Sequence, residues 1–175
     1  MDRPPAPAIP LQGDERTLLL AFLDFYRAAL VDRAFGLSHE QLQVAHPPAT
    51  LTLSRLLGHM AFVEQFWFRE RFDGLELGEP WASLDWETDR DAEMALAQVW
   101  PVEQLLATFN DSVADSRARV EAAVSLDQLS AKSADDGQQW NLRWILIHMI
   151  EEYARHCGHA DLIREAIDGD SLAPD

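Results

Sequence analysis

Apolar residues recur at helical spacing in four long segments of the chain, and this periodicity constrains the fold more than any other feature. Spacings of three and four residues place side chains on one face of a helix that turns about 100° per residue. We expect helices from about residue 14 to 35, 52 to 72, 101 to beyond 120, and 141 to 167. The expected inward stripes of the first three are Leu18, Phe22, Phe25, Ala29 and Leu30; Leu56, Met60, Val63 and Trp67; and Leu105, Phe109, Val113 and Val120.

Capping and breaking residues support these boundaries. Asp14 and Asn141 are good N-caps, and Pro101 suits a first helical turn. Glycines 36, 74 and 169 follow three of the segments, as is typical of helix ends. Residues 74–99 are turn-rich with one short helical pattern, and residues 133–139 resemble a loop. The sequence therefore predicts an all-α fold, a four-helix bundle with a mixed crossover between the second and third long helices. Another all-helical arrangement is the alternative.

Composition limits the class of protein. The chain has 175 residues, and we expect one domain over 14–169, an extended Pro-rich arm over 1–13 and a tail over 170–175. The formal charge of -16 disfavours nucleic acid and anionic membranes as partners. No signal peptide and no apolar run near ~20 residues is evident, so no membrane segment is expected. The single cysteine, Cys157, fits a reducing cytoplasm.

The last helical segment combines an apolar face with metal-capable side chains. In HMIEEYARHCGHADLIREAIDG, residues 148–169, the side chains of His148, Glu152, His156 and His159 fall within a wedge of roughly 80°. Ile145 and Ile163 share this wedge, so it faces inward, whereas Glu151 falls outside it and Cys157 lies almost opposite. Buried polar groups are costly unless something satisfies them, and a divalent metal would do so.

A further ligand is expected from another helix. His59, in LLGHMAFVEQFWF, lies at the edge of the second helix's apolar stripe. His39 and His46 fall in loop-like segments and are poorer candidates. A hydrogen-bonded core histidine is the alternative reading of His59.

The chain resembles the DinB-like superfamily, and within it the mycothiol-dependent maleylpyruvate isomerase-like proteins. The resemblance rests on GDERTLLLAFLDFYRAAL, GLSHEQL, LTLSRLLGHMAFVEQFWF and NLRWILIHMIEEYARHCGHADLIREAIDG. It implies a four-helix bundle holding one divalent metal, zinc or nickel, and often a homodimer. Family ligands are one His on the second helix and, in this branch, Glu-x3-His on the last. The matching residues are His59, Glu152 and His156.

Four other residues are candidates for supporting or substrate-binding roles: His148, His159, Arg155 and Trp67. His148 is expected beside the ligands and could replace one of them. His159 either supports the site or makes a core hydrogen bond. Arg155 either faces an anionic substrate or pairs with Glu151 on the surface. Trp67, with Phe66 and Tyr26, either lines a pocket or packs in the core.

The resemblance implies a thiol transferase or isomerase, in which a mycothiol-like thiol binds the metal as a thiolate and attacks an electrophile. The open position left by three protein ligands suits this chemistry. A hydrolase using metal-bound water, a non-catalytic metal-binding stress-response module and a metal-free bundle remain alternatives. Cys157 is expected to be a small apolar filler rather than the nucleophile.

Overall fold

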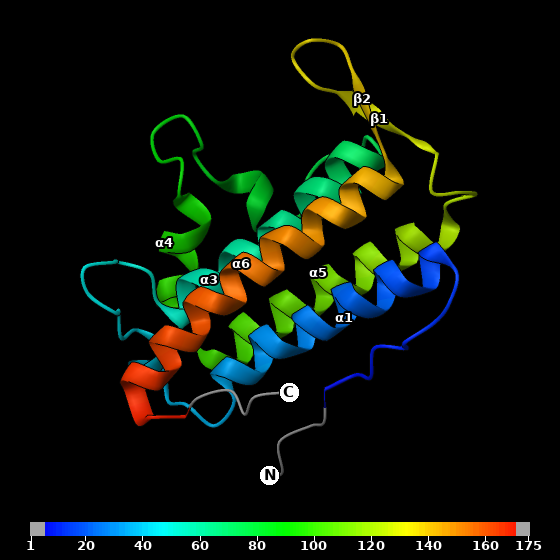
Figure 1. The fold of residues 1–175 in the computed structure, drawn as a ribbon. Helices are drawn as coiled ribbons and strands as arrows, with labels where there is room; N and C mark the ends of the chain where they lie inside the picture. Colours follow the sequence, from blue (N-terminus) through cyan, green and yellow to red (C-terminus); the bar gives the residue numbers. More distant parts are fainter. Residues whose placement is uncertain (1–5, 171–175) are drawn as a thin grey trace.

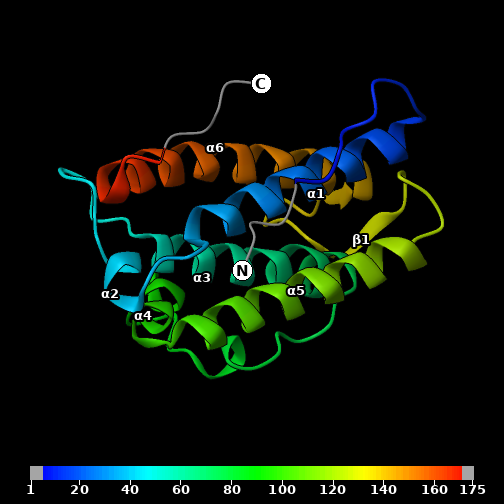
Figure 2. The same ribbon diagram turned by 90° about the horizontal axis from the view of Figure 1, so that it is seen from below.

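The computed structural model describes residues 6–170, and these residues are mostly helical, which confirms the all-α class. The long helical segments are α1 (Glu15–Ala34), α3 (Leu53–Glu64) continued by η1 (Gln65–Phe72), α5 (Val102–Ala122) and α6 (Leu142–Asp168). α1 packs along α6 and α3 along α5, with α3 also against α6 (Figures 1 and 2). The shorter elements are α2 (His39–Leu42), η2 (Trp81–Ser83), α4 (Ala92–Val99) and a hairpin of β1 (Leu129–Ser133) and β2 (Gln139–Asn141). The expected arm over 1–13 and tail over 170–175 fall partly outside the described residues.

Local capping determines where the helices begin and end. The Asp14 side chain accepts a hydrogen bond from the Thr17 amide, and Asn141 accepts one from Trp144 at 2.8 Å. Gly169 adopts a left-handed backbone with φ of 76° directly after α6. These three boundaries confirm the expectations from the sequence, because caps are local interactions that the sequence itself specifies.

The second long helix departs from the expected α geometry. From Gln65 to Phe72 the backbone forms a π-helix, and the Asp73 amide bonds to the Phe68 carbonyl five residues back at 3.3 Å. Two residues of this π-helix, Trp67 and Arg71, contact the ring of Trp140. Apolar spacing alone does not separate an α-helix from a π-helix over eight residues.

Residues 133–139 join two short strands, where the sequence suggested only a loop. β1 and β2 pair antiparallel and project beyond the start of α6 (Figure 1). Gly137, with φ of 83°, lies in the turn between them. The strands hold five and three residues, too few for alternation of apolar and polar residues to reveal them.

The inward face of α1 also differs from the expected stripe. Phe22 is 41% exposed, and Leu18, Phe25 and Ala29 are only partly buried. The buried residues are Leu23, Arg27, Leu30, Arg33 and Ala34. Of the expected stripe only Leu30 is fully buried, because the inward face of α1 also holds Arg27, whose burial the apolar spacing does not reveal.

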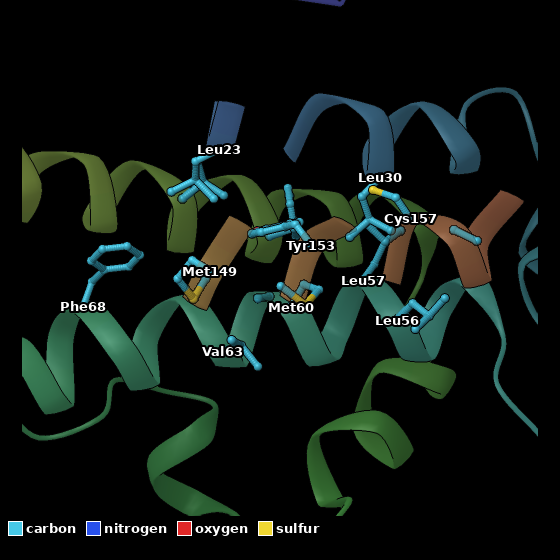
Figure 3. Close-up of a cluster of buried hydrophobic side chains, with 14 of the residues drawn as sticks. Leu23, Leu30, Leu56, Leu57, Met60, Val63, Phe68, Met149, Tyr153 and Cys157 are labelled. Carbon is cyan, nitrogen blue, oxygen red and sulfur yellow. The ribbon is translucent and has the colours of Figure 1, made fainter. Parts of the chain in front are cut away.

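Arg27 instead belongs to a buried polar network that joins three helices. Its Nε and Nη2 atoms donate to the two carboxylate oxygens of Glu64, each at 2.7 Å, and the Tyr153 hydroxyl donates to Glu64 Oε1 at 2.7 Å. Glu64 and Tyr153 are fully buried, and Figure 3 shows Tyr153 among apolar side chains of α1, α3 and α6. Burial lowers the pKa of the Arg27 guanidinium, but the charge and hydrogen bonds of Glu64, with those of Asp24, raise it well above its usual value, so the guanidinium stays charged.

A close approach between α3 and α4 depends on Gly58. A Cβ at this position would lie 2.1 Å from the Cβ of Ala97, far inside van der Waals contact. Only glycine therefore lets α4 pack at this depth, and the packing places Glu93 of α4 beside His59 of α3.

Within residues 6–170, each helix is too short or too polar to cross a lipid bilayer.

Replacing Glu64 by Leu should remove the buried, bidentate partner of Arg27 and leave its guanidinium paired only with Asp24, with a loss of about 3–5 kcal/mol in the free energy of unfolding. Urea denaturation measures this loss. The triple variant Arg27→Met, Glu64→Leu and Tyr153→Phe replaces all three buried polar side chains by apolar ones and should recover most of it. A loss below about 1 kcal/mol in the Glu64→Leu protein would contradict the role assigned to the network.

Two glycine substitutions form a matched pair. Gly58→Ala should lower the free energy of unfolding by about 1–3 kcal/mol, because α4 must move away from α3. Gly158→Ala, at an exposed position of α6 with open space around it, should raise it by about 0.5–1 kcal/mol. Urea denaturation of both proteins checks the difference, and equal effects would show that the α3–α4 contact is not tight.

Candidate metal centre

His59, Glu152 and His156 come together between α3 and α6. One donor atom from each lies within 4.8 Å of the other two. The rings of His59 and His156 are 5.1 Å apart, and His156 Nε2 lies 3.4 Å from Glu152 Oε2. The spacing of four residues in α6 aligns Glu152 with His156, and the packing of α3 on α6 supplies His59. The structure thus assembles the trio that the sequence predicted, and their role as metal ligands stays a prediction.

Glu93 holds His59 in place, and the sequence analysis did not find it. His59 Nδ1 lies 2.8 Å from Glu93 Oε1, and the Glu93 side chain is 3% exposed. A carboxylate at Nδ1 leaves Nε2 of the ring for another partner, as in carboxylate–histidine–metal arrangements. Glu93 Oε2 is buried without a hydrogen-bond partner. No signal in the residues around Glu93 marks it, because only the docking of α4 brings it to His59.

His156 is neutral in its surroundings. Its side chain is 11% exposed. Burial is the main cause that lowers its pKa, to about 4, and a charge on His59 would lower it further. At neutral pH the imidazole is therefore unprotonated, which is the form that binds metals.

His148 lies next to the trio but does not complete it. Its Nε2 is 3.9 Å from Glu152 Oε1, and its Nδ1 is 3.6 Å from Glu151 Oε2. Within residues 6–170, the donor atoms form two groups that share only Glu152: the trio, and His148 with Glu151 and Glu152. His148 therefore does not close the trio into a four-ligand site.

The remaining candidates lie at different depths. His159 Nδ1 lies 3.4 Å from His156 Nδ1, so His159 borders the trio from the next turn. Arg155 is exposed and, among the described residues, forms no ion pair with Glu151. His39 begins α2 rather than lying in a loop, His46 is exposed, and neither joins a donor group.

Cys157 faces away from the donors, as its helical position predicted. It is 6% exposed, and its Sγ lies 3.5 Å from the Tyr26 carbonyl oxygen on α1. Burial raises the pKa of the thiol to about 12. Such a thiol is protonated at neutral pH and is not a nucleophile.

Aromatic rings form one wall beside the donors. Trp67 contacts Trp140, Trp144 and His148 with ring separations of 5.3, 5.3 and 4.7 Å. The Trp144 ring stacks on that of His148 at 5.0 Å and is 44% exposed. Phe66 points elsewhere, against Phe62 and under the Arg71 guanidinium. Trp67 packs partly against the core and also contacts His148 and Phe66, so its role in lining a pocket stays a prediction.

The fold and this cluster define a class of protein: a mostly helical chain with a His/Glu/His donor set between two of its helices. A family model described as mycothiol-S-transferase matches residues 18–169. The chain therefore belongs to the mycothiol S-transferase family. The comparison with curated proteins gave no match.

The metal-free protein should lose stability as the pH falls from 6.5 to about 4. In this window the unfolded chain binds a proton at residue 156 that the folded protein excludes, because the pKa of His156 is lowered on folding. Urea denaturation in a chelator at several pH values measures the effect. His156→Gln should flatten the pH dependence, and His46→Gln, at an exposed position, should not; equal curves for both variants would contradict the assignment.

Proposed function

We propose that this protein is a divalent-metal-dependent thiol S-transferase, with the metal held by His59, Glu152 and His156. The observation that carries the proposal is the donor trio in a member of the mycothiol S-transferase family. A low-molecular-weight thiol of the mycothiol type is the proposed cosubstrate, and a small electrophile is the second substrate. Thiol-assisted isomerisation is the nearest related activity.

The residues present fit a metal. Two imidazole nitrogens and one carboxylate oxygen are a donor set that zinc accepts, and nickel is the second choice. Three protein ligands leave a position open for a substrate. When bound, such a metal lowers the pKa of a coordinated thiol, so that a thiolate exists at neutral pH.

The chain's own side chains prepare this site. Glu93 binds Nδ1 of the His59 ring, which leaves Nε2 for a metal, and the low pKa of His156 keeps that second ring unprotonated. Cys157 is protonated and turned toward α1, so the reacting thiol must come from a small molecule. The family description, mycothiol-S-transferase, favours the thiol mechanism over metal-bound water or a purely binding role.

We further propose a DinB-like four-helix bundle over residues 14–169 as the single domain. A homodimer and a cytoplasmic location complete the proposal. The reducing environment implied by one buried, unpaired cysteine supports the location.

Protein purified without a nickel column should retain about one tightly bound metal ion per chain. His59→Ala combined with His156→Ala should lose it, because one carboxylate does not hold the ion alone. Elemental analysis after dialysis measures both. Retention of metal by the double variant would contradict the assignment of His59 and His156 as metal ligands.

Thiol binding is tested on the cobalt-substituted protein. Mycothiol should shift the visible absorption spectrum, because a sulfur ligand changes the cobalt spectrum, whereas bacillithiol and glutathione serve as comparisons. Consumption of thiol with a panel of electrophiles then gives the activity. An unchanged spectrum with all three thiols would exclude the thiol mechanism while leaving the metal site intact.

Glu93→Gln should weaken metal binding about 10- to 100-fold, because the neutral amide no longer fixes and polarises the His59 ring. Competition with a chelating dye measures the affinity. Glu103→Gln, on the exposed side of α5, is the matched control and should leave the affinity unchanged. Equal affinities in the two variants would show that Glu93 has only a structural role.

A further inference from the structure

The two oxygens of Glu152 face different histidines. Oε2 lies 3.4 Å from His156 Nε2, within the trio, and Oε1 lies 3.9 Å from His148 Nε2, outside it. The carboxylate therefore lies between two nitrogen donors on the same side of α6. A carboxylate that bridges two metal ions has this arrangement, with one oxygen directed to each ion.

The separations suit a shared cation better than hydrogen bonds. His148 Nδ1 to Glu151 is 3.6 Å and His148 Nε2 to Glu152 is 3.9 Å, both beyond ordinary hydrogen-bond length. One ion binds one ring nitrogen of His148, and the separation of Nε2 from Glu152 Oε1, 3.9 Å, falls in the range of roughly 3–4 Å between two ligands bound at about 2.1 Å to the same ion. By contrast, the His59–Glu93 contact at 2.8 Å is a true hydrogen bond.

His148 is held in place by its aromatic neighbours. Its ring stacks on Trp144 at 5.0 Å and meets Trp67 edge-on at 4.7 Å. The ring is 23% exposed, so one side stays open to solvent while the other is packed. The imidazole and the two carboxylates are donors at i, i+3 and i+4 of one helix, and one donor atom of each lies within 4.8 Å of the other two, so a small shift of the exposed Glu151 side chain brings all three to one ion.

We propose that His148, Glu151 and Glu152 bind a second divalent cation, with Glu152 bridging it to the metal of the trio. The bridge rests on the proposed function, since it requires a metal in the trio, whereas the second donor group stands on its own geometry. The donors are one imidazole nitrogen and carboxylate oxygens, which suit zinc or manganese. Two-metal sites in which ions lie about 3.5–4 Å apart stabilise charge on both reacting groups of a substrate.

The negative charge around His148 favours a bound cation. Glu151 and Glu152 are adjacent in the chain, and the protein carries a formal charge of -16. A cation would offset the repulsion between the two carboxylates. Glu151 is 59% exposed, so the second ion should bind more weakly than the first and exchange with solvent.

Calorimetric titration of the metal-free protein with zinc tests the proposal. The wild-type protein should show two steps and a final stoichiometry of two ions per chain. His148→Gln and Glu151→Gln should each abolish only the weaker step. Glu165→Gln, an exposed residue further along α6, is the matched control and should keep both steps.

Manganese gives an independent readout of the bridge. Electron paramagnetic resonance of the doubly loaded protein should show magnetic coupling between two ions, which Glu151→Gln abolishes. Circular dichroism confirms that each variant is folded. One step of unchanged affinity in wild type and His148→Gln would overturn the second site. Absence of the tight step in the wild-type protein would instead contradict metal binding by His59, Glu152 and His156. Failure of the second site and failure of the proposed function therefore give different titrations.

Discussion

The buried contact between Arg27 and Glu64 is the interaction on which the rest of the structure depends. It places a bidentate ion pair among buried apolar side chains and ties α1 to α3, while the Tyr153 hydroxyl ties both to α6. An ion pair in this position has strict geometry, because a shifted helix would leave a charge without its partner. The network therefore determines the register of the three helices, and the register of α3 against α6 determines whether His59 meets Glu152 and His156.

The donor cluster depends on a second packing constraint outside the long helices. Gly58 lets α4 lie against α3, and α4 brings Glu93 to His59. Gly58, the residue before His59, thus allows the packing that places Glu93 beside His59. On the other side of the cluster, the π-helix η1 brings Trp67 against His148, and the β1–β2 hairpin brings Trp140 against Trp67. The site is therefore supported by segments that lie far apart in the chain.

Much of the candidate site could be predicted because its main motif is local. Glu152 and His156 are one helical turn apart, so the periodicity of α6 alone places them on the same face, and it turns Cys157 away. Glu93 could not be predicted, since its partner is 34 residues away and the contact exists only after α4 docks. The face of α1 was misjudged for a related reason: the burial of Arg27 follows from Glu64, a residue on another helix.

By itself, the sequence determined the all-α class, the caps at Asp14, Asn141 and Gly169, and the inward alignment of the α6 donors. These features depend on neighbours within about one helical turn, where the chain's own geometry decides which atoms meet. Only the tertiary structure decided that His148 belongs to a separate donor group, that Glu93 holds His59, and that a charged pair lies in the core. Those outcomes depend on which helices pack together and how deeply, and local spacing carries no information about either.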